Sequence, residues 1–215
     1  MKRLVSKIFR PFRNWRRQRF YKKKFGKCTK DVVILSNDCL AGITYHDANR
    51  PFLSPTINLT VVNDFLTFAK YFDFYCGQKL ESVMNPIECP RGILRGNEKL
   101  PDIQIKFTHY KTFEESENKW NKRVKRATKE FPLYIIYTTE RITNDEINII
   151  RSINFAKLIC LHKNECNFIV PNVVFVKIPD SYKNKDITSF KSLLSRKRFF
   201  DDFVDLYSLI YATDD

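Results

Sequence analysis

Residues 133–161 read LYIIYTTERITNDEINIIRSINFAKLICL, and this stretch decides the fold class. It begins and ends with short apolar runs, at 133–137 and 156–161, which are typical of buried strands. Between the runs, Thr143 and Glu146 have the spacing of a capping box, which predicts a helix to about Ile153. A strand, a helix and a strand in this order predict two parallel strands joined by a crossover helix.

The same alternation continues outward from this unit as far as Asp31. Further strands are expected at 32–35, 103–107 and 173–178, and further helices at 62–72, 112–129 and 199–210. We therefore predict an α/β domain over residues 31–215, built as a three-layer sandwich with helices on both faces of a mostly parallel sheet. The segments 37–60 and 77–101 have no clean period and are expected to be structured loops.

Residues 1–30 differ sharply from this domain, because they hold thirteen of the 38 Lys and Arg residues and no Asp or Glu. Large apolar residues recur there at steps of four, four and three: Leu4, Ile8, Phe12 and Trp15. This spacing predicts a basic amphipathic helix, with Pro11 as a point where it is kinked or divided. We expect residues 1–27 to bind an anionic membrane surface. The alternative is a solvated, disordered basic tail.

The charge distribution bears on the kind of partner. The whole chain has a net charge of +14, but residues 31–215 hold 25 basic and 24 acidic side chains. Nucleic-acid binding is unfavoured, because the basic surface does not continue onto the folded domain. No apolar run is long enough to span a membrane, and residues 1–30 lack the apolar region of a signal peptide. We expect a cytoplasmic protein that is peripheral at the inner face of the cell membrane, with its six cysteines reduced.

Polar residues follow the expected strands, where ligands bind in open α/β sheets. Asn37 and Asp38 follow the first strand, and His109 and Tyr110 follow the strand at 103–107. If these strands are parallel, the four residues share one edge of the sheet. The catalytic candidates are His109, Asp38 and His46, because a histidine can act as general acid or base near neutral pH and a carboxylate can orient it. The alternative is that His109 only ends a strand.

The helix expected after Tyr110 carries Trp120, Arg123 and Arg126 at steps of three. Arginine forks match the geometry of phosphate groups, which predicts a nucleotide-sugar or sugar-phosphate ligand. The alternative is a solvated basic face beside a core tryptophan. The substrate-binding candidates are therefore Asn37, Ser54, Tyr110, Trp120, Arg123 and Arg126.

Several motifs are absent from the sequence. It contains no GxGxxG or GxxxxGK[ST] phosphate loop and no Asp-x-Asp pair at a strand end, so we predict neither a metal nor an organic cofactor. It also contains no GxSxG nucleophile elbow. Cys39, next to Asp38, is a possible nucleophile, and packing is the alternative role for such a thiol.

Four motifs occur in order along the chain: ILSNDCLAG at 34–42 with Tyr45 and His46, LSPTINL at 53–59, FTHY at 107–110, and Trp120-x-x-Arg123-x-x-Arg126. Together they resemble the bacterial domain-of-unknown-function family nineteen-nineteen over roughly residues 31–210. Members are often labelled exopolysaccharide or capsular polysaccharide biosynthesis proteins. The resemblance implies an α/β fold and a role in surface polysaccharide assembly, without naming a reaction. Asp38 and Ala41 depart from the commoner Asn and Gly.

We therefore expect a metal-independent, glycosyltransferase-like enzyme at the membrane surface. It would transfer a sugar or related group to a lipid-linked saccharide, and residues 1–27 would hold it beside that acceptor. One alternative is a non-catalytic, membrane-associated partner of polysaccharide assembly enzymes. Another is a nucleic-acid binder that acts through residues 1–30 alone.

Overall fold

The computed structural model describes residues 2–25, 31–57, 59–83, 89–127 and 130–212. Its first sheet has four parallel strands in the order β1-β6-β7-β8. They are β1 (Val33–Ser36), β6 (Leu133–Thr139), β7 (Lys157–His162) and β8 (Val173–Lys177). Val33 lies beside Leu133, and Leu158 lies beside Val173. The prediction of a mixed α/β fold with a mostly parallel sheet is confirmed.

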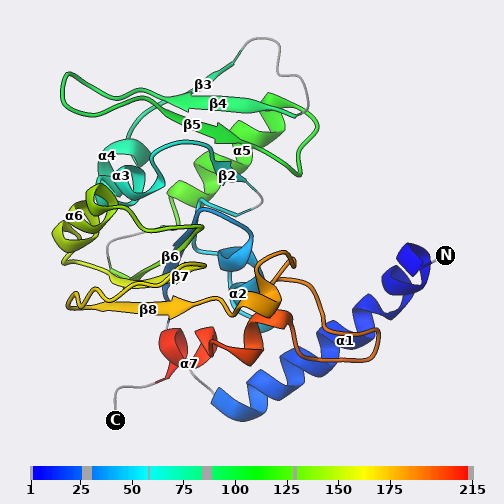
Figure 1. Ribbon diagram of the computed structural model, residues 1–215. Coiled ribbons are helices and arrows are strands. Elements are labelled where there is room, and N and C mark those ends of the chain that lie inside the picture. The colour runs from blue at the N-terminus through cyan, green and yellow to red at the C-terminus, as the bar shows by residue number, and fades with distance from the viewer. Residues whose placement is uncertain (1, 26–30, 58, 84–88, 128–129, 213–215) are drawn as a thin grey trace.

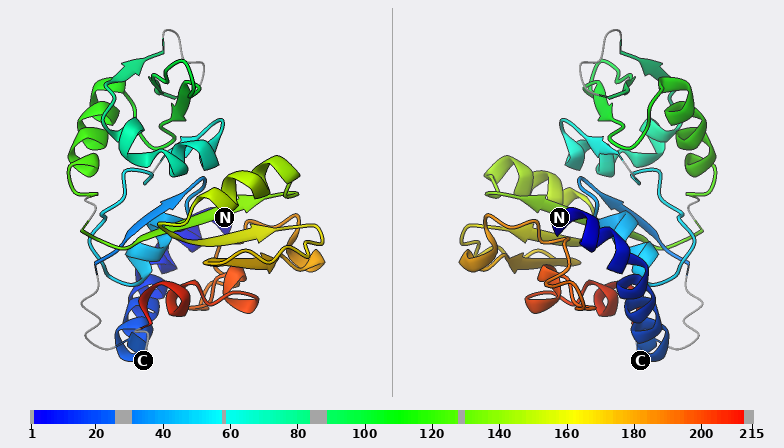
Figure 2. Two further views of the ribbon diagram at one scale, coloured as in Figure 1. Left: turned by 90° about the vertical axis from the view of Figure 1, so that its left-hand side faces the viewer. Right: turned by 90° about the vertical axis from the view of Figure 1, so that its right-hand side faces the viewer.

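Helices cover both faces of this sheet, as Figures 1 and 2 show. On one face lie α6 (Asn144–Ser152) and α3 (Phe65–Lys70), and on the other lie α2 (Leu40–Asp47) and α7 (Leu206–Tyr211). The predicted capping box starts α6: Thr143 Oγ1 accepts from the Glu146 amide, and Glu146 accepts from the Thr143 amide. Ile147 and Ile150 then fall on its buried side.

The second sheet is antiparallel and was not predicted. Its order is β2-β5-β4-β3, formed by β2 (Thr60–Val61), β5 (Ile103–Lys106), β4 (Arg91–Leu94) and β3 (Leu80–Ser82). The strand at 103–107 was therefore correctly located but assigned to the wrong sheet. Its alternation explains the difference, because Ile103 and Ile105 are buried while Gln104 is exposed. Such a strand suits an antiparallel sheet with one face in water.

Several predicted helices and loops have different limits in the structure. The helix at 62–72 is divided into α3 and α4 (Phe72–Cys76), and Asn63, just before α3, accepts from the Gln104 amide at 2.8 Å. The segment 37–60 contains α2, and the helix at 199–210 is a 3₁₀ turn, η2 (Phe199–Asp202), followed by α7. A second 3₁₀ turn, η1 (Asp180–Tyr182), follows β8. Thr112 caps α5 (Phe113–Val124), which ends before the predicted Lys129.

The N-terminal helix α1 (Lys2–Phe25) is present as predicted and continues through Pro11 without division. Figure 1 shows it along one side of the molecule, with its N-terminal end reaching beyond the α/β body. The side chains of residues 2–7 lie outside the described part, so the predicted place of Leu4 on the apolar face is not tested. Within the described residues, no helix is long and apolar enough to cross a membrane.

A cationic cavity beside the N-terminal helix

A cavity of about 760 Å³ lies between α1 and the α/β body, beyond the carboxyl end of β1. Six basic side chains line it, and we call it the cationic cavity: Arg10, Arg13, His46, His109, Arg123 and Arg198. None of the described residues that line it is an Asp or a Glu. A cavity of this size that presents positive charge suits an anionic ligand with a few phosphate or carboxylate groups.

The cavity brings together three residues singled out in the sequence. His46 comes from α2, exposed His109 follows β5, and half-buried Arg123 comes from the last turn of α5. His109 reaches this place from the antiparallel sheet, so the reasoning from a shared parallel edge was wrong although the residues do converge. Cys39 also lines the cavity.

Two contacts hold Arg123 in position. Its Nη1 donates to the carbonyl oxygen of Ile57 at 2.5 Å, and its guanidinium carbon lies 6.0 Å from the centroid of the Tyr110 ring. Tyr110 in turn packs edge-on against Phe107, with ring centroids 6.0 Å apart. Tyr110 therefore serves as a support for Arg123, a role different from the predicted direct contact with substrate.

Arg13 and Arg198 form the wall nearest the C-terminal part of the chain. Both guanidinium groups pack on the ring of Phe190, at 4.8 Å for Arg13 and 4.2 Å for Arg198. Burial and the neighbouring charges of Arg198 and Arg10 lower the pKa of Arg13. A site that crowds like charges in this way favours a bound anion, because the anion relieves their repulsion.

Asp47, a residue that the sequence analysis missed, holds these walls together. Its buried carboxylate accepts from Arg198 Nε at 2.8 Å and Nη2 at 3.1 Å, from Tyr207 Oη at 2.9 Å, and from Arg17. His46 Nδ1 lies 3.2 Å from Asp47 Oδ1. Burial alone would raise the pKa of Asp47, but the hydrogen bonds from His46 and Arg198 and the charge of Arg17 hold it well below its usual range.

Arg17 links the same cluster to α1. Its guanidinium is buried and also pairs with Asp201, with Nη2 donating to Oδ1 at 2.9 Å. Arg13 and Arg17 are therefore buried, although they belong to a strongly basic amphipathic helix. The Leu193 carbonyl that accepts from Arg13 and the Asp201 carboxylate that pairs with Arg17 lie about 180 positions later in the chain, which no local pattern reveals.

Asn37 and Asp38 lie at the carboxyl end of β1 but do not line the cavity. Asn37 exchanges two hydrogen bonds with the backbone of Thr138, at 2.8 and 2.9 Å. Asp38 accepts from Thr138 Oγ1 at 2.9 Å and from the Leu40 amide at 2.8 Å. They join β1 to β6 and start α2, and Asp38 is not among the residues that line the cavity with His109. Burial raises the pKa of Asp38.

Three other candidates also lie elsewhere. Ser54 is fully buried, with its Oγ 2.9 Å from Thr56 Oγ1, and Trp120 is a core residue packed on Phe68 with ring centroids 6.4 Å apart. Arg126 is exposed and outside the cavity, because α5 ends at Val124 and the spacing of three no longer applies. Burial, together with the charges of Asp38 and Asp186, raises the pKa of the Cys39 thiol, which disfavours a nucleophilic role.

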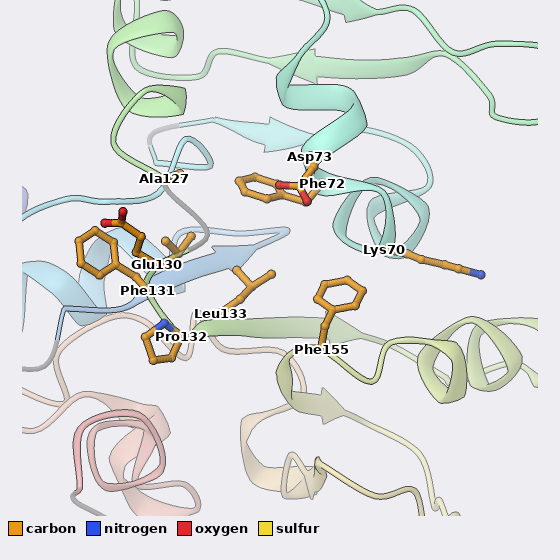
Figure 3. Close-up of a pocket in the computed structure, with 10 residues that line it drawn as sticks. Lys70, Phe72, Asp73, Ala127, Glu130, Phe131, Pro132, Leu133 and Phe155 are labelled. Atoms are coloured by element: carbon orange, nitrogen blue, oxygen red, sulfur yellow. The ribbon is translucent and has the colours of Figure 1, made fainter.

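A second cavity, of about 490 Å³, lies at the opposite, amino end of the parallel sheet (Figure 3). It is lined mainly by apolar side chains, which we call the apolar pocket: Val33, Phe72, Phe131, Pro132, Leu133 and Phe155. Asp73 and Glu130 are its acidic residues, and Figure 3 shows Lys70 extending away from it. The two cavities therefore differ in both position and charge.

Two sequence comparisons show the family to which the chain belongs. Residues 10–209 match the family described as a domain of unknown function (DUF1919). A protein of Haemophilus influenzae described as uncharacterized is 30% identical over 153 residues, which cover 69% of this chain and 71% of the relative. The chain belongs to the DUF1919 family, as the motifs indicated. The match begins at residue 10, so it includes the part of α1 that lines the cationic cavity.

Proposed function

We propose that this protein is a membrane-surface transferase of exopolysaccharide or capsular polysaccharide biosynthesis, and that the cationic cavity binds the phosphate groups of its sugar donor. The donor would be a nucleotide-sugar or a sugar-phosphate. The acceptor would be a lipid-linked saccharide at the inner face of the cell membrane. The polysaccharide setting rests on the family resemblance, and the ligand class rests on the cavity.

One observation carries the choice of ligand: four arginines and two histidines line one cavity, and no carboxylate is among its described lining residues. The nearest carboxylate of the cluster, Asp47, is buried behind Arg198 and Arg17 and is already engaged by them. Diphosphate groups accept several charge-assisted hydrogen bonds at once, and arginine forks supply them in pairs. The Arg198 fork already binds Asp47, and its Nη1 donates to the carbonyl oxygen of Thr188. The proposal therefore assigns the donor phosphates to Arg123 and Arg10, and Arg198 contributes positive potential to the wall.

His109 is the best placed general base. It is exposed at the cavity, so an acceptor hydroxyl can approach it. In the proposed transfer, the bond from the sugar to the donor phosphate breaks and a bond to the acceptor oxygen forms. The hydroxyl proton passes to a ring nitrogen of His109, and the arginines stabilise the charge left on the phosphate. His46, whose Nδ1 lies beside Asp47, lines the same wall.

The membrane part of the proposal rests on the outer side of α1. Ile8, Phe12 and Trp15 are exposed there by 68%, 45% and 53%. Exposed basic residues accompany them at Arg19, Lys22 and Lys23. Apolar anchors among basic residues are typical of helices that lie in the interface of an anionic bilayer.

Thermal unfolding in the presence of inorganic diphosphate and a panel of nucleotide-sugars tests the ligand class. A ligand that binds only the native protein raises the melting temperature, and saturation at a hundred times its dissociation constant adds about 2.7 kcal/mol. We expect diphosphate-containing compounds to stabilise the protein and neutral sugars to have no effect. Equal stabilisation by neutral sugars, or none by any compound, would contradict the proposal.

His109→Ala separates an enzyme from a non-catalytic partner that merely binds a donor or lipid. Because His109 is exposed, its removal should leave the melting temperature unchanged and still permit stabilisation by diphosphate. Transfer to a lipid-linked saccharide should fall about 100-fold or more if His109 is the base. Transfer that survives in this variant would remove His109 from the mechanism.

A further inference from the structure

The helix α1 presents different chemistry on its two sides. Arg10, Arg13 and Asn14 face the cationic cavity, whereas Ile8, Phe12 and Trp15 lie on the side away from it and are exposed. A period of 3.6 residues per turn places these two sets on nearly opposite faces. One helix thus forms both a wall of the cavity and the apolar surface proposed to meet the bilayer.

The outer side is suited to an anionic bilayer in particular. The Arg16 guanidinium lies 5.6 Å from the centroid of the Phe12 ring, and that of Arg19 lies 5.5 Å from Trp15. Such pairs place aromatic rings next to positive charges. At the boundary between acyl chains and anionic headgroups, the rings can contact the acyl chains while the charges contact the headgroups. Residues 1–30 contain no acidic side chain that would oppose this contact.

The attachment of α1 to the body is uneven along its length. Its later turns are fixed by Arg17 in the buried cluster and by Gln18, which donates to the carbonyl oxygen of His46 at 2.9 Å. Toward the N-terminus, the first described hydrogen bond to the body comes from Arg13, at 3.4 Å. Arg10 is exposed and lies next to Pro11, which has no amide proton to donate.

Short helical segments are marginally stable in water unless one face is packed. The turns that carry Arg10 therefore gain most from a surface that binds Ile8 and Phe12. We propose that binding of an anionic bilayer to the outer side of α1 completes the wall formed by Arg10 and Arg13, so bilayer binding and anion binding favour each other. This inference rests on the proposed function, because it assumes that the cavity binds a diphosphate.

Equilibrium dialysis of the full chain with labelled inorganic diphosphate tests the coupling. The dissociation constant is measured without vesicles, with phosphatidylcholine vesicles, and with mixed phosphatidylcholine and phosphatidylglycerol vesicles. We expect the mixed vesicles to tighten binding about 5-fold or more, and diphosphate to strengthen vesicle binding by the same factor, as linkage requires. Phosphatidylcholine alone should have little effect.

The double variant Phe12→Ser/Trp15→Ser should lose the vesicle effect while it binds diphosphate in solution like wild type. Ile169→Ser is the matched control, because Ile169 is an apolar residue that is 95% exposed on another part of the surface. It should retain the full effect. The circular dichroism spectrum of each variant, compared with that of wild type, shows whether the helix content is retained. Ile8→Ser gives a second variant of the same surface.

The outcomes separate the two proposals. If diphosphate does not bind under any condition, the proposed function fails. If it binds with the same affinity with and without anionic vesicles, only the coupling is overturned. If the double variant keeps the vesicle effect, or if α1 prefers another protein to vesicles, the outer side of α1 is not the bilayer contact.

Discussion

The two cavities at opposite ends of the parallel sheet are built in different ways. The apolar pocket is lined largely by side chains next to the amino ends of strands, such as Val33 and Leu133. These apolar surfaces would also pack well against one another if the pocket closed. The cationic cavity takes its walls from segments spread between residues 10 and 198. Its basic side chains repel one another, so a buried carboxylate is needed to hold them. The difference indicates that forming the cationic cavity lowers the stability of the fold, because it brings like charges together, whereas forming the apolar pocket does not.

Among the variants described here, Asp47→Ala should lower the free energy of unfolding most, and it tests the cost of the cationic cavity directly. Removing one member of a buried ion cluster leaves uncompensated charge, which typically lowers the free energy of unfolding by about 3–5 kcal/mol. Urea unfolding measures the change. Glu140→Ala is the control, because Glu140 pairs with Lys163 at the surface and is 78% exposed. Its loss should cost about 1 kcal/mol or less. Similar costs for the two variants would contradict the role of Asp47.

Phe72→Ala tests the apolar pocket as an ordinary part of the core. Phe72 is buried and packs edge-on against Phe68 with ring centroids 5.9 Å apart, so its truncation should cost about 3 kcal/mol. Phe155 lines the same pocket and is half-exposed, so Phe155→Ala should lower the free energy of unfolding by about 1 kcal/mol. Neither variant should change the affinity for inorganic diphosphate. A large loss of affinity in either would show that the two cavities are coupled.

Arg123→Lys should act on the ligand far more than on the fold. Lysine keeps the charge but loses the paired hydrogen bonds, so we expect the dissociation constant for diphosphate to rise about 10-fold, or about 1.4 kcal/mol. The lost contact with the Ile57 carbonyl should change the free energy of unfolding by about 1 kcal/mol at most. Calorimetric titration measures the affinity. Arg126→Lys, beyond the end of the same helix, should bind like wild type.

Asp38→Asn should change the free energy of unfolding least, and it contrasts half-buried Asp38 with fully buried Asp47. Because burial raises the folded pKa of Asp38, its protonated form favours the folded state, and this contribution is lost as pH rises through the folded pKa. The asparagine variant does not titrate. The stability of wild type relative to the variant should therefore fall as the pH rises above about 4, the ordinary pKa of an aspartate. A difference that grows over this range would mean that Asp38 is stabilised as an anion.

Local signals account for what the sequence predicted correctly. The capping box at Thr143 and the apolar runs on either side are complete within thirty residues, so they identify the strand, helix and strand directly. The antiparallel sheet was missed because β2, β3 and β4 have only two to four residues each and lie among proline and glycine residues. Their pairing, which depends on distant strands, has no short-range pattern.

The residues of the candidate site also divide into those with a local signal in the sequence and those without one. His109 and Arg123 were identified because each follows or lies on an element that could be recognised locally, and His46 was identified in the segment after the first strand although its helix, α2, was not predicted. Asp47, Arg17 and Arg198 were missed, because a sequence does not show which charged residues meet in the fold: Asp47 lies 30 positions from Arg17 and 151 from Arg198. The one available signal was the position of Asp47 directly after His46.

The attachment of α1 also has a consequence for synthesis and folding. Arg17 pairs with Asp201, 184 positions later in the chain, and Lys24 pairs with Asp205, 181 positions later. The helix is synthesised long before the segment on which it docks, and contacts between such distant residues form late and slowly. During that interval only Asp47, among its described carboxylate partners, has been made early. The nascent chain therefore carries a basic amphipathic helix whose docking side is uncovered before the cationic cavity exists.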